Sequence, residues 1–317
     1  MKWLLSLGLF LSVAAQETKP QDPQPTEGLT LAATPDKTET VLGDEIQIEV
    51  KLQNTGEKIL EVTEPTFEKR SLSFEITIPG APGKGKRTFA WWVLRPDPHV
   101  ANRLPLPRIS LAKGQTVSAF YRIPTLQAGE MEIVAKYAGG EKELKATSFK
   151  INVKESERGK RLAAILSTEK GDVVIDLMPE VSPANVMNFV NLVRAQFYDR
   201  MIFHRVIRGS WVQTGCPYGI GVGGAGYAVP SEKSRDVLHD LGTVSMSGFE
   251  KTDFNGSQFF LCLGKIPSLD EKYTVIGKVT EEASLNVLQQ LGRVETDRNT
   301  DRPKDDLDLK KVVIVVK

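Results

Sequence analysis

Alternating apolar and polar residues mark the first half of the chain. Within residues 28–154, apolar side chains recur at every second position in several segments, as in Ile46, Ile48, Val50 and Leu52. A period of two is typical of strands that bury one face. Turn residues, mainly Asn, Gly and Pro, separate these segments. The pattern predicts roughly seven or eight short strands and a β-sandwich of the immunoglobulin-like class.

Two adjacent tryptophans, Trp91 and Trp92, stand out in this half. A tryptophan pair can present a binding surface, or one ring can face the core while the other is half covered. In the first alternative the sandwich binds a protein partner through the tryptophans, whereas in the second the tryptophans serve only to pack the sandwich itself.

The N-terminus has a different composition. Lys2, the apolar run 3–11 and the small residues Val13-Ala14-Ala15 predict a signal peptide over residues 1–15. Residues 16–27 are polar and proline-rich, which predicts a flexible linker. Spanning a bilayer takes about 20 apolar residues, so we expect no stable membrane insertion, with an uncleaved anchor as the alternative. The protein is therefore expected to be exported, either periplasmic or secreted.

A second pattern begins after a charged junction that contains glycine, residues 155–160. A strand hairpin is expected first. A helix should then begin at Ser182-Pro183, with serine as its N-cap and proline at its first position. A second helix is expected over residues 281–291, with Gly292 at its end. Strands together with two helices fit a closed β-barrel capped by helices, which we assign to residues 160–317.

Composition narrows the function further. The 317 residues suffice for about two domains. A net charge of +1 gives no electrostatic footprint for nucleic acid or an anionic membrane. Cys216 and Cys262 are the only cysteines, so they form either two buried free thiols or one bridge. The three histidines, His99, His204 and His239, lack ligand spacing, so we expect no metal.

A glycine-rich stretch spells the spacing of a dinucleotide-binding turn at Gly221, Gly223 and Gly226. That turn must lead into a helix. Here Tyr227-Ala228-Val229-Pro230 follows, and proline argues against a helix. We therefore expect no nucleotide, and no other cofactor, in this protein.

The segment Phe203-His204-Arg205-Val206-Ile207 places a cation among apolar residues. Alternation along a strand predicts that Phe203, Arg205 and Ile207 share one face. A guanidinium beside two large apolar groups needs partners or a functional reason. The alternative is an arginine at a strand end whose head group lies in water.

Five segments in this order resemble the cyclophilin-type peptidyl-prolyl cis-trans isomerases. The resemblance covers roughly half the chain, from about Arg161 to the C-terminus. It implies an isomerase that acts on proline-containing polypeptides and assists the folding of exported proteins, without a cofactor. The segments are residues 203–213, 223–227, 242–246, 255–261 and 269–279.

The resemblance also implies roles for individual residues. Arg205 would donate a hydrogen bond to the prolyl nitrogen of the twisted amide, Gln213 would hold the substrate backbone, and Phe260 would form the floor of the pocket. Further substrate contacts are implied at Phe203, Ser210, Trp211, Met246, Ser247, Gly248, Gln258, Leu269 and Tyr273.

Several pocket positions depart from the family's pattern. Ser210 stands where an aromatic residue is usual, Trp211 replaces a methionine, Ser247-Gly248 replaces Ala-Asn, and Ser268 replaces a tryptophan. Because a shift of one residue along a strand changes its face, we expect Trp211 to rebuild the lost wall only if the backbone bulges. These departures leave a second function open, a non-catalytic module that binds proline peptides or serves as a scaffold.

Overall fold

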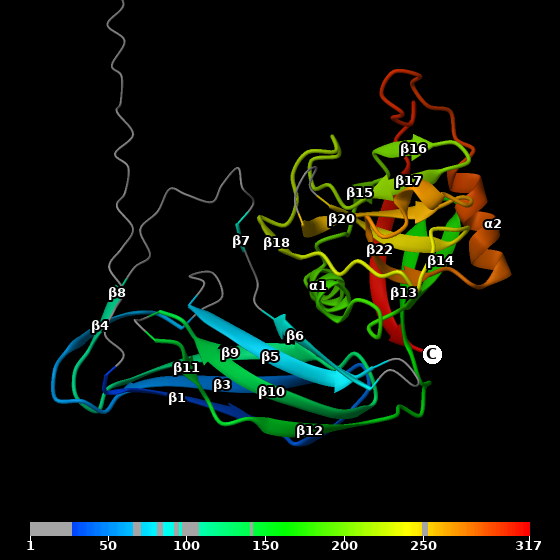
Figure 1. Ribbon diagram of the computed structural model, residues 1–317. Coiled ribbons are helices and arrows are strands. Elements are labelled where there is room, and N and C mark those ends of the chain that lie inside the picture. Colours follow the sequence, from blue (N-terminus) through cyan, green and yellow to red (C-terminus); the bar gives the residue numbers. More distant parts are fainter. Residues whose placement is uncertain are drawn as a thin grey trace, which may run out of the picture.

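The computed structural model describes residues 27–65, 71–80, 85–91, 95–96, 108–139, 142–248 and 253–317. The expected signal peptide, most of the linker and Trp92 lie outside these residues. The described chain is mainly β with two helices, as the sequence predicted (Figure 1). Among the described residues, no helix combines the length and apolar character that crossing a membrane requires.

Two sheets lie face to face in the N-terminal half (Figure 1). Ile46 and Ile48 of one sheet and Phe74 and Ile76 of the other are fully buried, which confirms the predicted alternation. Phe74 meets Tyr121 edge-on across the two layers, with ring centroids 5.5 Å apart. The first sheet contains β1 (Leu29–Pro35), β3 (Glu45–Asn54) and β9 (Thr116–Pro124). The second contains β2 (Glu39–Val41), β12 (Phe149–Lys154), β10 (Gly129–Tyr137), β5 (Leu72–Pro79) and β6 (Lys86–Trp91), with β11 (Leu144–Lys145) beside β10.

A short separate ribbon pairs β4 (Leu60–Thr63) with β8 (Arg108–Leu111). It covers a second, smaller cluster of buried side chains that includes Leu60, Leu111 and Tyr137. Trp91 is 2% exposed, so this tryptophan belongs to the core. Its burial leaves no binding surface on the ring of Trp91.

One large sheet forms the C-terminal half. Its strand path is open, running from β15 to β16, so strand pairing does not confirm the predicted closed barrel. The strands, in spatial order, are β15 (Met201–Ile202), β22 (Asp308–Val316), β13 (Leu162–Thr168), β14 (Gly171–Leu177), β21 (Thr274–Lys278), β19 (Thr243–Gly248), β20 (Phe254–Cys262), β17 (Trp211–Thr214) and β16 (Arg205–Ile207). Two further strands attach at the side, β18 (Tyr227–Pro230) on β20 and β7 (Arg95–Pro96) on β18.

Helix α1 (Pro183–Arg194) begins where the sequence predicted, but its cap differs. The Ser182 side chain makes no cap and instead donates a hydrogen bond to the carbonyl of Val275. The Glu232 carboxylate takes the capping role, because it accepts from the backbone N–H of Asn185 at 2.9 Å. An anion at a helix N-terminus satisfies the free N–H groups and favours the helix dipole.

The second helix, α2 (Glu282–Leu291), ends at Gly292 as predicted and packs on β14. Its Ser284 hydroxyl accepts a hydrogen bond from the backbone N–H of Val174 at 3.0 Å. The single 3₁₀ turn of the described chain, η1 (Pro267–Leu269), precedes β21.

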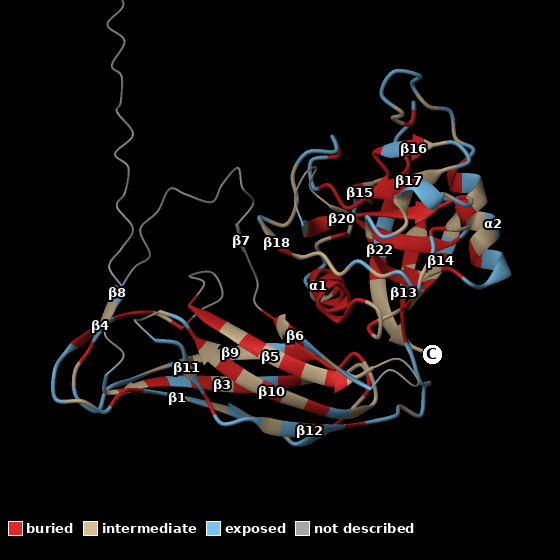
Figure 2. Cartoon of the chain, in the orientation of Figure 1, coloured by how far each residue is buried: buried red, intermediate tan, exposed pale blue. Residues whose placement is uncertain are grey.

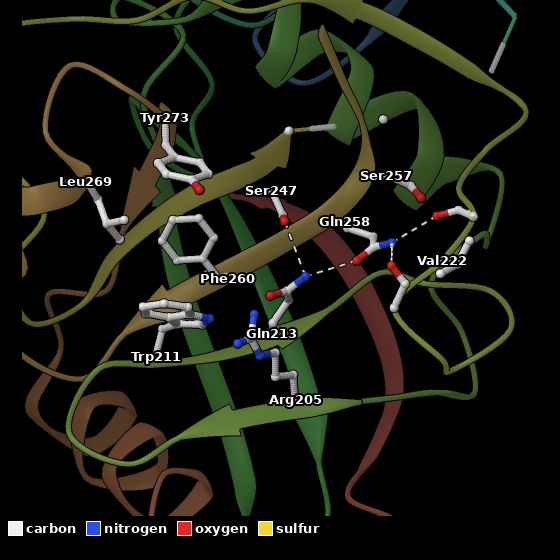
Figure 3. A pocket seen from close by; sticks show the side chains of 14 residues that line it. Arg205, Trp211, Gln213, Val222, Ser247, Ser257, Gln258, Phe260, Leu269 and Tyr273 are labelled. Carbon is white, nitrogen blue, oxygen red and sulfur yellow. Dashed lines mark hydrogen bonds between the residues drawn. The ribbon is translucent and has the colours of Figure 1, made fainter. Parts of the chain in front are cut away.

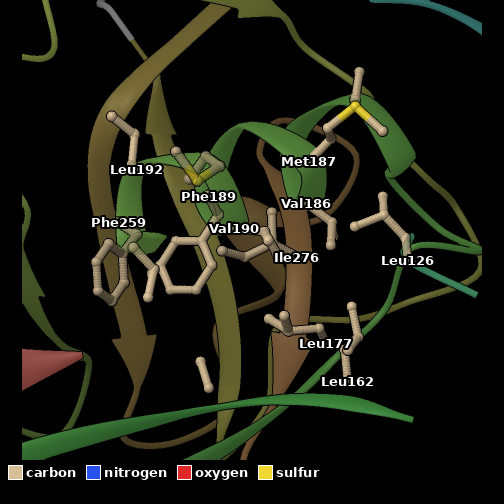
Figure 4. Close-up of a cluster of buried hydrophobic side chains, with 14 of the residues drawn as sticks. Leu126, Leu162, Leu177, Val186, Met187, Phe189, Val190, Leu192, Phe259 and Ile276 are labelled. Atoms are coloured by element: carbon tan, nitrogen blue, oxygen red, sulfur yellow. The ribbon is translucent and has the colours of Figure 1, made fainter. Parts of the chain in front are cut away.

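Helix α1 lies between the two halves of the chain (Figures 1 and 2). Ten of its twelve residues are buried, so its burial is not confined to one face. A helix that is buried on all sides needs cover on all sides. Leu126, from the β9–β10 connection, lies beside Val186 and Met187 of the helix and supplies part of that cover (Figure 4). The main hydrophobic core is therefore continuous across the two halves.

Two arginines fix the ends of this helix to the N-terminal half. Arg87 of β6 donates to the carbonyl of Glu180 at 2.9 Å, just before the helix. Arg194, in its last turn, pairs with Glu45 at 2.7 Å and donates to the carbonyl of Gly43. Because these bonds are directional, they set the orientation of α1 as well as its distance.

We expect Leu126→Ala to loosen α1, because the substitution removes apolar cover from Val186 and Met187. The free energy of unfolding should fall by about 2–4 kcal/mol. Amide hydrogen exchange within residues 183–194 should become faster. Leu111→Ala removes the same atoms from the second cluster and is the matched control. Equal exchange of α1 in the two variants, at equal loss of stability, would contradict this coupling.

Candidate active site

A pocket of about 470 Å³ opens on the C-terminal sheet. It lies over β16, β17 and β20 and is flanked by the glycine-rich segment 221–223 (Figure 3). Phe203, Ser210 and Met246 do not line it. The predicted site residues that do line it are Arg205, Trp211, Gln213, Ser247, Gly248, Gln258, Phe260, Leu269 and Tyr273.

Strand register brings the three central residues together. Arg205 of β16 is directly opposite Gln213 of β17, and Gln213 is directly opposite Phe260 of β20. Residues opposite one another in antiparallel strands project from the same face of the sheet. A cation, an amide and an aromatic ring therefore form one row across three strands, although 55 positions separate the first from the last.

Trp211 shares this face because it lies two residues before Gln213 on β17. Its ring centroid is 5.8 Å from that of Phe260. The pairing of β16 with β17 shows no register shift, so the expectation that a bulge would be required is wrong. Ser210 precedes the strand, where alternation does not apply, and its carbonyl accepts from the backbone N–H of Leu263.

Aromatic rings surround Phe260, which is only 3% exposed. Tyr273 meets it edge-on at 5.4 Å, and His239 stacks behind it at 6.1 Å. The His239 ring is held on both sides, by Asp270 at 2.9 Å and by the Ser245 hydroxyl at 2.8 Å. The pocket floor is thus a fixed apolar surface of the kind that accepts a small apolar ring.

Amide side chains connect the floor to the glycine-rich segment. The Gln213 side-chain N–H groups donate to Gln258 at 3.0 Å and to the Ser247 hydroxyl at 3.2 Å. Gln258 in turn donates to the carbonyls of Gly221 and Gly223, both at 2.9 Å (Figure 3). Among the described residues, these bonds leave the side-chain carbonyl oxygen of Gln213 as an acceptor within the pocket.

Asn188 of helix α1 and Tyr198, which follows the helix, hold the backbone of the pocket wall. Asn188 donates to the carbonyl of Gly256, and Tyr198 donates to the carbonyl of Ser257, each at 2.9 Å. Both donors are buried. Two buried side-chain donors therefore fix the backbone of the pocket wall.

The predicted alternation through residues 203–207 is wrong. Strand β15 ends at Ile202 and β16 begins at Arg205, so a break separates Phe203 from the arginine. Phe203 is fully buried in the core, and so is Met246 of β19, which explains why neither lines the pocket. The Arg205 side chain is 44% exposed and projects over the pocket.

No sequence pattern indicated the partner of Arg205. Asp301, from the loop before β22, accepts from the Arg205 Nε and Nη2 atoms at 3.3 and 3.2 Å. The backbone carbonyl of Asp301 also accepts from the N–H of Val206 at 2.8 Å. The Trp211 ring contributes a further contact, with its centroid 5.7 Å from the guanidinium carbon. The guanidinium is therefore oriented from two sides, and it keeps N–H groups without a partner among the described residues.

His204 lies beneath this arrangement and is 6% exposed. Neither of its ring nitrogens has a hydrogen-bond partner among the described residues. Burial, with the neighbouring charges of Arg302 and Arg205, lowers the pKa of His204 from 6.5 to about 4. The ring is therefore neutral at physiological pH and adds no positive charge beside Arg205.

The cysteines, the glycine-rich segment and the possible metal ligands are the remaining candidates for chemistry. Cys216 and Cys262 are both free and buried, and burial raises the pKa of the Cys262 thiol to about 12. The glycine-rich segment leads into strand β18, so the helix that a dinucleotide site requires does not follow it. Across the described part of the chain, His, Cys, Asp and Glu side chains form no group of three or more suited to a metal ion.

Comparison with known proteins gives one consistent answer. The family model described as cyclophilin type peptidyl-prolyl cis-trans isomerase/CLD matches residues 163–314. The chain is 41% identical over 140 residues to a peptidyl-prolyl cis-trans isomerase of Helicobacter pylori, covering 44% of this chain and 85% of that protein. It is 42% identical over 139 residues to a protein of the same name from Synechococcus elongatus, covering 44% of this chain and 90% of that protein.

Solved structures include a similar chain, a Cryptosporidium parvum cyclophilin type peptidyl-prolyl cis-trans isomerase crystallised in the presence of the dipeptide Ala-Pro. The identity is 30% and the TM-score is 0.45, with 49% of this chain and 99% of that chain covered.

The buried His204 predicts an acid-sensitive contribution to stability. Its folded-state pKa, about 4, lies below the ordinary value of 6.5, so the unfolded chain takes up a proton first as the pH falls. The stabilisation is therefore fully present above pH 6.5 and is lost towards about pH 4. The loss should reach about 3 kcal/mol at most. Denaturant unfolding across this range should show a shallower pH dependence for His204→Gln, whereas equal slopes would contradict the assignment.

Proposed function

This chain belongs to the cyclophilin-type peptidyl-prolyl cis-trans isomerases, and from that premise we propose that the pocket over β16, β17 and β20 catalyses rotation about X-Pro peptide bonds. The observation that carries the proposal is the row formed by Arg205, Gln213 and Phe260 on one face of the sheet. It combines a cationic donor, a backbone-binding amide and an apolar floor within one pocket.

The reaction needs no covalent step. Resonance gives the peptide bond a rotational barrier of about 18–20 kcal/mol, and unassisted exchange at proline takes tens to hundreds of seconds. In the twisted amide the prolyl nitrogen becomes pyramidal and can accept a hydrogen bond. We propose that Arg205 donates to this nitrogen only near the transition state, which lowers the barrier without tightening the ground state.

The proline ring should bind on Phe260. Trp211, Leu269 and Tyr273 surround this floor, and aromatic contacts hold Phe260 in place. The side-chain carbonyl oxygen of Gln213 and the adjacent amides suit the polar backbone of a bound peptide. Apolar enclosure with a few fixed polar groups is typical of small binding pockets.

Arg205 cannot supply the whole rate enhancement. An acceleration of six decades requires about 8 kcal/mol. One hydrogen bond to a charged group contributes about 1.5–3 kcal/mol. The remainder must come from holding the ring and the flanking carbonyl, so the fixed floor matters as much as the guanidinium.

We further propose that the substrates are exported polypeptides, on the basis of the signal-like sequence at residues 1–15, which lies outside the described residues. The N-terminal half is proposed to be an immunoglobulin-like sandwich over residues 28–154, followed by the isomerase domain at 160–317. Within that domain, the sheet is proposed to close into a barrel, with residues 203–204 joining its two edge strands, β15 and β16. The continuous core across the halves supports a fixed placement of the two parts.

Arg205→Ala should lower kcat by about tenfold to 100-fold, the equivalent of about 1.5–3 kcal/mol, while KM stays nearly unchanged. Arg205→Lys should recover little activity, because an ammonium lacks the planar fork that Asp301 orients. The measurement is catalysed cis-trans exchange of a proline peptide by NMR.

Arg208→Ala is the matched control, since Arg208 lies three positions further along, is exposed and does not line the pocket. Its rate should equal that of the unmodified protein. If the unmodified protein and Arg205→Ala both exchange the peptide at the uncatalysed rate, the protein is instead a non-catalytic module that binds proline peptides.

Asp301→Asn should lower kcat by up to about fivefold with KM nearly unchanged, because a half-exposed ion pair contributes about 0.2–1 kcal/mol to holding Arg205. Asp301→Glu should restore part of the loss. Glu295→Gln breaks a different ion pair in the same loop, with Lys304 at 2.9 Å, and should leave kcat unchanged. Equal kinetics for Asp301→Asn and Glu295→Gln would show that Asp301 does not position the arginine.

A further inference from the structure

Three large apolar side chains project into solvent from one short segment beside the pocket. Tyr218, Ile220 and Val222 are 73%, 66% and 65% exposed. They lie in the connection between β17 and β18, which carries a run of exposed residues (Figure 2). Single exposed apolar residues are common on protein surfaces, but three within five positions form a patch that calls for a cause.

The backbone of this segment is held in place. Arg302 donates to the carbonyl of Gly219 at 2.7 Å, and the Cys216 thiol donates to that of Val222 at 3.2 Å. Gln258 holds the carbonyls of Gly221 and Gly223. The carbonyl oxygens of four residues, 219 and 221–223, are thereby anchored. Ile220 and Val222 lie within this anchored stretch, and Tyr218 immediately precedes it.

Glycine makes this arrangement accessible. Gly219 and Gly221 adopt φ angles of +63° and +79°, a region that residues with a Cβ atom rarely occupy. The chain therefore turns its carbonyls inward at the glycines while the residues between them face solvent. A fixed apolar surface loses little conformational entropy when a ligand covers it.

The patch is continuous with the pocket. Val222 lines the pocket itself, and so do the two glycines that flank it, Gly221 and Gly223. The Tyr218 ring lies against Gly223, since a Cβ atom added there would come within 2.8 Å of the ring. A polypeptide that leaves the pocket past Val222 meets an apolar side chain of this segment, and the exposed Tyr218 and Ile220 lie within the four residues before it.

We propose that Tyr218, Ile220 and Val222 form a docking surface for apolar residues that flank the target proline in an unfolded polypeptide. The inference rests on the proposed isomerase function and adds a preference for substrate sequence. Covering the patch removes apolar area of both partners from water, which is the main favourable term in such association. The occupant is a substrate chain rather than a folded partner, because the surface continues directly into the pocket.

Three synthetic peptides provide the test. All share the core Ala-Pro-Ala; one carries serines on both sides, one carries two leucines before the core, and one carries two leucines after it. For the full chain, kcat/KM should be about tenfold higher for one of the leucine peptides than for the serine peptide. The double variant Tyr218→Ser/Ile220→Ser should lose this preference through a higher KM, with kcat and the serine peptide unaffected.

The matched control is Ile59→Ser/Phe120→Ser, which removes two side chains of similar exposure, 68% and 61%, from the N-terminal half. It should keep the preference for leucine. Ile220→Ser alone, which leaves the Tyr218 ring on Gly223, should lose part of the preference and guards against a disturbed loop. Thermal unfolding of each variant should match that of the unmodified protein.

The outcomes separate the two proposals. If the full chain isomerises the serine and leucine peptides equally well, or if the double variant retains the leucine preference, the docking surface is refuted while the isomerase function stands. If no peptide is isomerised above the uncatalysed rate, the proposed function itself fails, and the docking surface fails with it.

Discussion

The antiparallel register across β16, β17 and β20 is the constraint on which the site depends. It sets Arg205 opposite Gln213 and Gln213 opposite Phe260, so that three chemically different groups share one face. A shift of one residue in either pairing would send one of them to the other face. Trp211 enters the pocket by the same rule, and the amide bonds of Gln258 extend the order to the glycine-rich segment.

Helix α1 connects this sheet with the N-terminal half. On one side it packs against Leu126 and is fixed by Arg87, while on the other its Asn188 holds the carbonyl of Gly256 in the pocket wall. The same buried element therefore stabilises the joint between the halves and the backbone of the site. This arrangement links the N-terminal half to the pocket, although, among the described residues, that half contributes no side chain to the pocket lining.

Local patterns determined much of the fold. Alternation predicted the buried faces of β3 and β5, and turn and cap residues predicted where both helices lie. These features follow from interactions within a few positions of the chain, which is why the sequence carries them. Most of the residues proposed for the site could also be predicted from the sequence, because short segments in a fixed order resemble a known family. The pocket brings most of these residues together.

Only the tertiary structure decided which distant groups complete these elements. Glu232 caps α1 in place of Ser182, Asp301 orients Arg205 from 96 positions away, and Phe203 lies in the core because the strand breaks before Arg205. A periodic sequence pattern cannot predict these contacts, because the partner residues Glu232 and Asp301 lie in loops, which have no repeating geometry. A sequence pattern specifies which face of an element is buried, whereas the residue that meets that face depends on how the whole chain packs.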